Sequence, residues 1–173
     1  NNRDIDIYLP PTYNNNKNKR YPVLYMHDGN NLFYTSLSFG GIAWEMDKTV
    51  DKLVNNGIIE EIIIVGIHNT MSRDYEYTWN QMKEGKHLSG GGGEKYARFI
   101  IQELKPLIDT HFRTLPDRNN TAVMGSSLGG LITFYLGLYA SSVFGKVGIV
   151  SPSFWWGNGI AYRQVLEIKN NLQ

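Results

Sequence analysis

Thr121-Ala-Val-Met-Gly-Ser-Ser-Leu-Gly-Gly130 is the stretch around which the rest of the chain is arranged. Its first four residues are β-branched or apolar and predict a short buried strand, and residues 128–139 form an almost wholly apolar run that predicts a helix. Between them lies a Gly-x-Ser-x-Gly pattern. A strand, a sharp turn and a helix in this order are typical of a nucleophile elbow, which exposes the central serine above the sheet. Ser127 is therefore the candidate nucleophile.

The neighbouring Ser126 lies off the centre of this pattern, so it is disfavoured as the reactive hydroxyl. The five letters alone are weak evidence, because the chain contains 18 glycines and serine is a common residue. The strand before the pattern and the apolar helix after it are the stronger part of the prediction.

The composition indicates a globular protein and argues against several classes of partner. The chain has 173 residues, 42% of them hydrophobic, and its 17 basic and 16 acidic residues give a net charge of +1. That length and apolar content can bury a core and favour a single domain. Without a basic stripe, nucleic acid or an anionic membrane has little support as the main partner. No apolar run approaches the roughly 20 residues that span a bilayer, so we expect a soluble protein.

The absence of cysteine excludes disulfides, thiolate catalysis and Cys-ligated zinc, and it leaves a cytoplasmic and an exported location both open. The chain starts at Asn1 with neither a methionine nor a signal peptide, so we expect a piece of a longer product. It contains no HExxH motif, phosphate-binding glycine loop or carboxylate cluster, and neither a metal nor a nucleotide cofactor is expected.

Strands and helices are expected to alternate along the chain. The predicted strands cover 4–9, 21–26, 62–67, 121–124 and 146–151, and the predicted helices cover 44–55, 94–109, 128–139 and 161–172. The inner strands are uniformly apolar, as in a parallel sheet covered on both faces. Pro106 is expected to kink or end its helix, and residues 68–93 are expected to form a long functional or mobile loop. The fold class is therefore α/β.

A serine hydroxyl needs help to act as a nucleophile at neutral pH. Acyl transfer requires a histidine base, a carboxylate that orients it, and amide donors for the oxyanion. In a nucleophile elbow one donor is the N–H of the following residue, here Leu128, and the other comes from a loop after an earlier strand. His27-Asp-Gly-Asn30 lies in that position, and Gly29 lets the backbone turn inward, so the amide of Asn30 is the predicted second donor.

Five separate motifs extend this pattern over nearly the whole chain: Tyr21-Pro-Val-Leu-Tyr-Met-His-Asp-Gly-Asn-Asn-Leu-Phe33, Val65-Gly-Ile-His-Asn69, Arg73-Asp-Tyr-Glu-Tyr77, Gly125-Ser-Ser-Leu-Gly-Gly130 and Ser151-Pro-Ser-Phe-Trp-Trp156. Together, and in this order, they resemble the putative esterase (esterase D-like) family of α/β-hydrolases. That family includes enterochelin esterases, feruloyl and acetyl xylan esterase modules, and the antigen 85 mycolyltransferases.

The resemblance implies Ser127 as the nucleophile and the amides of Leu128 and Asn30 as the oxyanion hole. It also exposes a departure, because in such enzymes an acid and then a histidine follow the serine on loops after later strands. The chain ends at Gln173, one predicted helix beyond the strand that follows the elbow. We therefore expect residues 1–173 to form a single, incomplete α/β-hydrolase domain that lacks the triad acid and histidine.

None of the histidines stands where the chain order requires the base. His27 is interpreted as ordering the loop that follows it by hydrogen bonding, with a direct chemical role as the alternative. His68 ends a predicted strand and could contact substrate. His87 and His111 are expected on the surface.

Other polar and aromatic residues allow two interpretations each. Asp28 is expected to bind the backbone of its own turn rather than substrate, and Glu167 is expected to be a solvated charge. Trp155 and Trp156 are candidate substrate-binding residues that could stack on a sugar or an aromatic acyl group, or could pack against the sheet. The same two roles are open for an aromatic cluster in the long loop, which comprises Tyr75, Tyr77 and Trp79.

The leading hypothesis is a serine carboxylesterase that hydrolyses a small-molecule or carbohydrate-linked ester, such as a feruloyl or acetyl ester, through an acyl-enzyme on Ser127. An acyltransferase of the same fold would hand the acyl group to a sugar instead of water. A third hypothesis is a non-catalytic piece that keeps the scaffold without a triad. The 173-residue piece itself is expected to turn over ester very weakly or not at all.

Overall fold

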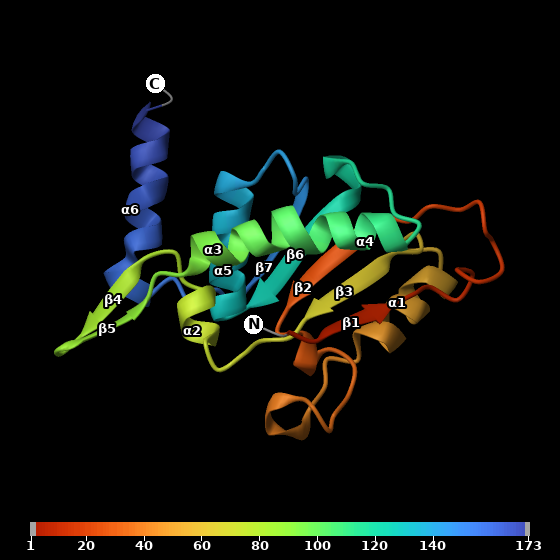
Figure 1. Ribbon diagram of the computed structural model, residues 1–173, viewed down its shortest axis with the longest axis horizontal. Coiled ribbons are helices and arrows are strands. Elements are labelled where there is room, and N and C mark those ends of the chain that lie inside the picture. The colour runs from red at the N-terminus through yellow and green to blue at the C-terminus, as the bar shows by residue number, and fades with distance from the viewer. Residues whose placement is uncertain (1–2, 172–173) are drawn as a thin grey trace.

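The computed structural model describes residues 3–171, in which helices cover both faces of a central sheet (Figure 1). The five-stranded sheet has the order β1-β3-β2-β6-β7. Its strands are β1 (Ile5–Tyr8), β2 (Val23–His27), β3 (Ile63–Ile67), β6 (Thr121–Ser126) and β7 (Lys146–Val150). β1 is antiparallel to β3, and the other neighbouring pairs are parallel. The predicted α/β class with a mostly parallel sheet is confirmed.

Helices pack on the sheet through two separate hydrophobic cores. The helices are α1 (Met46–Asn55), α2 (Arg73–Glu76), α3 (Gly93–Arg98), the π-helix η3 (Phe99–Leu104), α4 (Lys105–His111), α5 (Leu128–Tyr139) and α6 (Trp156–Asn171), with 3-10 turns η1 (Gly29–Asn31), η2 (Phe39–Gly41) and η4 (Arg118–Asn120). Successive residues of a strand point to opposite faces. Tyr25 and Val123 therefore join the core with α3, α4 and α5, whereas Met26 and Ile64 join the core with Val50 of α1.

Pro106 was expected to kink or end its helix, and the structure excludes the second of these outcomes. The helical backbone runs from Gly93 to His111, and its middle section widens into the π-helix η3. Within this section the Lys105 N–H donates to the Ile100 carbonyl, one residue farther back than in an α-helix. The wider turn lets the chain pass a residue that has no N–H of its own.

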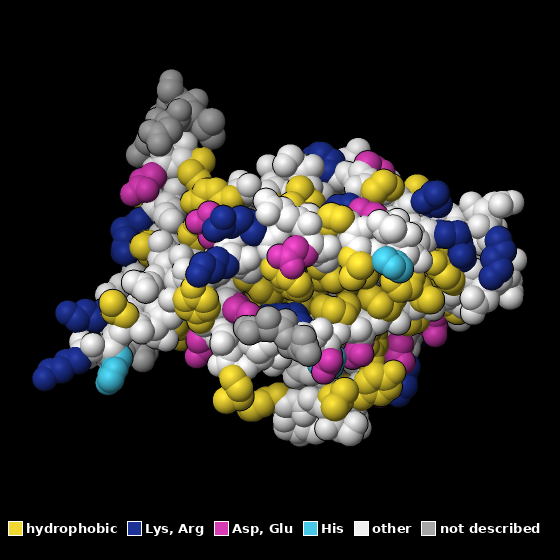
Figure 2. All heavy atoms as spheres, in the orientation of Figure 1, with side chains coloured by type: hydrophobic (Ala, Val, Ile, Leu, Met, Phe, Trp, Pro, Cys, Tyr) yellow, Lys and Arg dark blue, Asp and Glu magenta, His cyan; other side chains and the backbone are white. Residues whose placement is uncertain are grey.

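The segment predicted as one long loop contains regular structure. It forms α2 and a two-stranded antiparallel hairpin of β4 (Gln81–Glu84) and β5 (His87–Gly90). Gly85, with φ of 61°, lies in the connection between the strands. The hairpin strands are mostly polar and exposed, and Figure 2 shows basic and histidine side chains over the hairpin at the lower left. The strands therefore lack the apolar alternation by which a strand is recognised from sequence.

The last helix, α6, stands away from the sheet at the left of Figure 1. Three left-handed residues, Gly157, Asn158 and Gly159, interrupt its first turn, so the regular part of the helix begins close to the predicted start at residue 161. Tyr162, at 60% exposure, and Leu166, at 59%, line a groove together with Phe134 of α5 and Phe154. No helix in the described part of the chain is long and apolar enough to cross a membrane.

The parallel strands bring several chain segments to one edge of the sheet. β2, β6 and β7 end at His27, Ser126 and Val150, and these carboxyl ends lie next to one another. In open α/β sheets ligands bind beyond the carboxyl ends of the strands. The candidate site is therefore sought at this edge.

Candidate active site

Ser127 occupies a strained turn between β6 and α5. Its φ and ψ are 59° and −121°, a conformation that non-glycine residues rarely adopt. β6 ends at Ser126 and α5 begins at Leu128, so the turn consists of Ser127 alone and is shorter than the predicted strand, 121–124, implied. The Ser127 side chain is exposed at the end of the strand. A tight turn between strand and helix and an exposed serine side chain are the geometric features of a nucleophile elbow.

The glycines around Ser127 allow the elbow, residues 125–130, to pack against its neighbours. A Cβ on Gly125 would lie 2.5 Å from the Gly129 carbonyl oxygen and 2.8 Å from Cδ2 of His27. A Cβ on Gly130 would lie 2.8 Å from the carbonyl oxygen of Val150. Because backbone atoms cannot easily move aside, residues with side chains at these positions would force the turn apart.

The segment after β7 is attached to the elbow through its main chain. The Ser127 N–H donates to the Val150 carbonyl at 3.1 Å, and the Ser153 N–H donates to the Ser127 carbonyl at 3.0 Å. The Oγ atoms of Ser127 and Ser153 are 3.0 Å apart. Ser153 is 3% exposed, so its hydroxyl lies inside the protein next to the candidate nucleophile.

The loop after β2, residues 27–32, is held by an ion pair. Asp28 is left-handed, with φ of 57°, and is 8% exposed. Arg73 Nε donates to Asp28 Oδ1 at 2.7 Å, and Arg73 Nη2 donates to Oδ2 at 2.9 Å. Asn69 Nδ2 donates to Oδ1 at 2.6 Å, and the Asp28 N–H donates to the Tyr77 hydroxyl at 3.0 Å. The prediction that the Asp28 side chain binds its own turn is wrong, because Arg73 and Asn69 reach this carboxylate from another segment.

The ion pair also stabilises the charged form of Arg73. The hydrogen bonds from Arg73 to Asp28 raise the pKa of the guanidinium above its ordinary value. A bidentate pair of this kind fixes both side chains in one geometry. Asp28 of the β2 loop and Arg73 of α2 therefore form a fixed ion pair at the cavity.

His27 lies beneath the elbow and is fully buried. Its Nδ1 is 3.0 Å from the Tyr96 hydroxyl, whereas its Nε2 has no hydrogen-bond partner in the described part of the chain. Burial lowers the pKa of His27 to about 4, so the ring is neutral at pH 7. The ring contacts α3 through Tyr96 rather than bonding to the loop that follows it, which corrects the predicted role.

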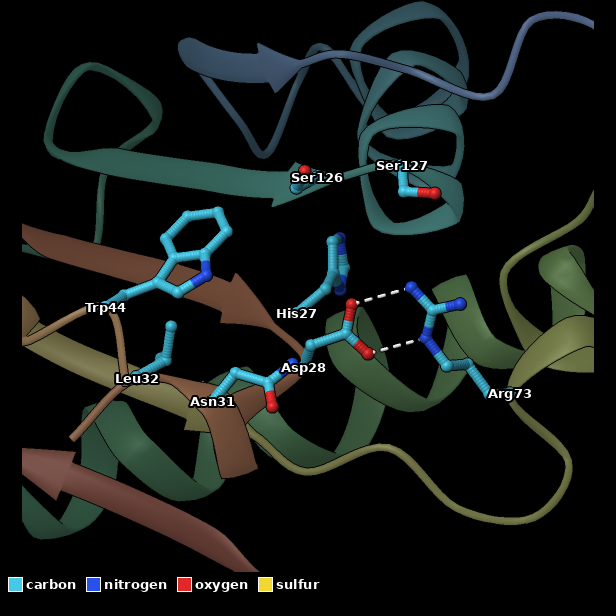
Figure 3. Close-up of a pocket in the computed structure, with 8 residues that line it drawn as sticks. All are labelled: His27, Asp28, Asn31, Leu32, Trp44, Arg73, Ser126 and Ser127. Atoms are coloured by element: carbon cyan, nitrogen blue, oxygen red, sulfur yellow. Dashed lines mark hydrogen bonds and ion pairs between the residues drawn. The ribbon is translucent and has the colours of Figure 1, made fainter. Parts of the chain in front are cut away.

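These groups surround a cavity of about 190 Å³ (Figure 3). Figure 3 shows Ser126 and Ser127 on one side, the β2 loop on the opposite side, and Trp44 and Arg73 at opposite ends. The cavity is thus apolar at one end and charged at the other. Its lining residues are His27, Asp28, Asn31, Leu32, Trp44, Arg73, Ser126 and Ser127.

The two predicted oxyanion donors lie in the first turns of helical segments. Leu128 is the first residue of α5, and Asn30 lies in η1. Amides at a helix start have no carbonyl partner within the helix. The cavity is lined by Asn31 rather than by Asn30, whose side-chain amide donates to Asn31 Oδ1 at 3.2 Å. Both oxyanion assignments remain predictions.

The candidate tryptophans differ in their surroundings. Trp156 is 5% exposed, and its Nε1 donates to the Asn80 carbonyl at 2.8 Å, so this ring packs inside the protein. Trp155 is 65% exposed, and neither ring lines the cavity. The packing role therefore suits Trp156 better than substrate binding. The cluster in the long loop also divides, since Tyr77 is fully buried and Tyr75 is 41% exposed.

The other histidines lie away from the cavity. His68 directly follows the last residue of β3, and its Nε2 is 2.7 Å from Asp6 Oδ2. His87 and His111 are exposed, as predicted, and so is Glu167. Among residues 3–171, no group of at least three His, Asp or Glu side chains could hold a metal ion.

Arg73 and Trp44 line the cavity, although neither was predicted from the sequence as part of the site. Arg73 stands in one of the quoted motifs, but its pairing with Asp28 joins distant segments and has no sequence signal. Trp44 fits the helical spacing of 44–55, yet α1 begins at Met46 because Glu45 is left-handed. The Trp44 N–H instead donates to the Asn31 carbonyl at 2.9 Å, which places the ring at the cavity.

Comparisons with known proteins agree with this architecture. YbbA of Bacillus subtilis is 28% identical over 171 residues, which cover 97% of this chain and 64% of YbbA. An endo-1,4-beta-xylanase/feruloyl esterase of Xylanibacter ruminicola is 32% identical over 84% of this chain and 19% of that protein. An IroE-like serine hydrolase from Shewanella oneidensis superposes with a TM-score of 0.77 at 27% identity, over 95% of this chain and 50% of the other.

This chain therefore spans less than two thirds of the length of these relatives. The sequence pattern of the family described as "Putative esterase" matches residues 1–173, the whole chain. The fold, the glycine-lined turn at Ser127 and the match over the full sequence lead to one conclusion: the chain belongs to the Putative esterase family.

Proposed function

We propose that the intact protein carrying this chain is a serine esterase, with Ser127 as its nucleophile. In this mechanism the Ser127 Oγ attacks the ester carbonyl carbon while a base takes the hydroxyl proton. The alcohol leaves with that proton, and water then hydrolyses the acyl-enzyme. The observation that carries the proposal is a left-handed, exposed serine at the carboxyl end of a parallel strand, beside a cavity. The name of the family, and that of the relative from Xylanibacter ruminicola, also support an esterase.

The proposed oxyanion hole consists of the amides of Leu128 and Asn30. Leu128 opens a 12-residue helix, whose N-terminal amides favour a negative charge. Gly29, directly before Asn30, packs closely against the backbone of β3, because a Cβ at this position would lie 2.4 Å from the Gly66 carbonyl carbon. Both donors thus belong to segments with little freedom to move, which is the property an oxyanion hole needs.

The histidine and acid of the triad are proposed to lie outside these 173 residues. His27 suits a base poorly, because it is neutral, buried and bonded through Nδ1 to Tyr96. The other three histidines do not line the cavity. Relatives such as YbbA have additional length in which such residues could lie. The 173-residue chain alone is accordingly expected to turn over ester very weakly.

The substrate is proposed to be an ester of a small or carbohydrate-linked alcohol whose acyl group fits between Trp44 and Arg73. A flat apolar ring at one end of the cavity and a guanidinium at the other suit a planar acyl group that carries a polar substituent. The relative from Xylanibacter ruminicola that is named a feruloyl esterase adds support.

The test combines labelling with turnover in the intact protein. A fluorophosphonate probe is expected to label wild type and not Ser127→Ala, and Ser127→Ala is expected to lose hydrolysis of p-nitrophenyl acetate and methyl ferulate. Ser142→Ala, a change at an exposed serine away from the cavity, serves as the matched control and should behave like wild type. Labelling or turnover that persists in Ser127→Ala would refute the mechanism.

A further inference from the structure

Ser153 is the one buried hydroxyl that touches the candidate nucleophile in the described structure. It belongs to the Ser151-Pro-Ser153 turn after β7, and its Oγ lies 3.0 Å from Ser127 Oγ. Its own N–H donates to the Ser127 carbonyl, so main chain and side chain both contact the same residue. Neither contact has a role in the mechanism described so far.

Burial determines which of the two hydroxyls donates. Each serine hydroxyl has one proton to donate and can accept two hydrogen bonds. Ser153 is 3% exposed, and Ser127 Oγ is the partner that the described structure offers to its hydroxyl. If Ser127 were the donor, the Ser153 proton would be left inside the protein without an acceptor, which is unfavourable. Ser127 is exposed and can direct its own proton elsewhere.

We propose that Ser153 is a positioning residue that donates a hydrogen bond to Ser127 Oγ during acylation. Ser153 keeps its proton throughout, and the Ser127 proton goes to the base. As the Ser127 oxygen gains negative charge, the bond from Ser153 becomes charge-assisted and stronger. The contact therefore stabilises the attacking oxygen and leaves the Ser127 O–H free to face the base. This inference rests on the proposed function.

The surrounding chain keeps the Ser153 hydroxyl in this position. Ser151 is left-handed, with φ of 40°, and the ring of Pro152 fixes the φ of the residue directly before Ser153. Phe154 packs edge-on against Phe134 of α5, with ring centroids 5.1 Å apart. The Val150 carbonyl accepts the Ser127 N–H at 3.1 Å. Since the turn is fixed at both ends, little reorganisation is needed when the charge develops.

The experiment compares Ser153→Ala, Ser153→Cys and Ser127→Ala in the intact protein. Cysteine nearly preserves the size of serine but is a weak donor. Loss of a charge-assisted bond predicts a fall in kcat of about tenfold or more in Ser153→Ala. KM should stay within about twofold, because the bond matters most as charge develops. The rate of labelling by a fluorophosphonate should fall in parallel, and Ser153→Cys should lie between wild type and Ser153→Ala.

Thermal unfolding separates positioning from a structural role. The proposal requires that kcat and labelling fall in Ser153→Cys while its unfolding temperature stays close to that of wild type. It is overturned if Ser127→Ala abolishes labelling while Ser153→Ala and Ser153→Cys react like wild type, or if activity falls only in step with unfolding temperature. Labelling that persists in Ser127→Ala instead refutes the proposed function, and this inference with it.

Discussion

The β2 loop, residues 27–32, and the elbow, residues 125–130, face each other across the same cavity but are held by different interactions. Polar side chains hold the β2 side: Asp28 pairs with Arg73, and His27, the last residue of β2, contacts the Tyr96 hydroxyl. Close main-chain packing holds the elbow. The two sides should therefore respond to different perturbations: charge should disturb the first, and side-chain volume the second.

The elbow should be the more sensitive to one added methyl group. Gly125→Ala is expected to lower the free energy of unfolding by about 3 kcal/mol or more, because its Cβ would lie 2.5 Å from the Gly129 carbonyl oxygen. Urea unfolding measures the change. The matched control is Gly137→Ala within α5, where the nearest atom is 3.3 Å away at the end of a valine side chain. Equal stability of the two variants would contradict the comparison.

The β2 loop should respond to pH through His27. Burial lowers the pKa of His27 to about 4 in the folded protein, below the ordinary 6.5. The unfolded chain therefore binds more protons between about pH 4 and 6.5, so the folded state loses stability as pH falls through this window. The protonation of His27 can lower the free energy of unfolding by up to about 3 kcal/mol across this window. His27→Gln should remove this part of the pH dependence, as measured by urea unfolding at several pH values.

His111→Gln is the control for that experiment, because His111 is exposed at the end of α4. Its stability should follow the wild-type pH dependence. If His27→Gln and wild type lost stability in parallel between pH 6.5 and 4, His27 could not be the buried neutral group described above.

The ion pair gives a smaller effect on the same loop. Arg73→Met leaves the Asp28 carboxylate without its bidentate partner and should cost about 2 kcal/mol of unfolding free energy, since both side chains retain some contact with solvent. Asp28→Asn combined with Arg73→Met should cost less than the sum of the single changes. Additive losses in this double-mutant cycle, measured by urea unfolding, would show that the pair contributes no coupling.

The sequence predicted the elbow far better than the β2 loop. The physical reason is that local packing holds the elbow, whereas contacts between distant residues hold the β2 loop. The elbow is local: an apolar strand, glycines and an apolar helix follow one another within residues 121–139, so their periodicity identifies them. The contacts of Asp28 join residues more than 40 positions apart, and no local pattern encodes them. The hairpin at 81–90 was missed because its strands bury little.

The smallest effect is expected at Trp44, whose ring forms the apolar end of the cavity. Given the proposed function, Trp44→Ala should raise KM for methyl ferulate about fivefold, the equivalent of one aromatic contact, and change KM for p-nitrophenyl acetate much less. Steady-state kinetics of the intact protein with both esters measures the ratio.

Phe39→Ala is the matched control, because Phe39 is 91% exposed and does not line the cavity. Its ratio of KM values for the two esters should equal that of wild type. An equal rise for both esters in Trp44→Ala would mean that the ring shapes the cavity without selecting the acyl group. A rise in KM for methyl ferulate alone, with an unchanged free energy of unfolding, would show that Trp44 selects the substrate without stabilising the fold. Substrate selection would then be separate from the interactions that stabilise the elbow and the ion pair.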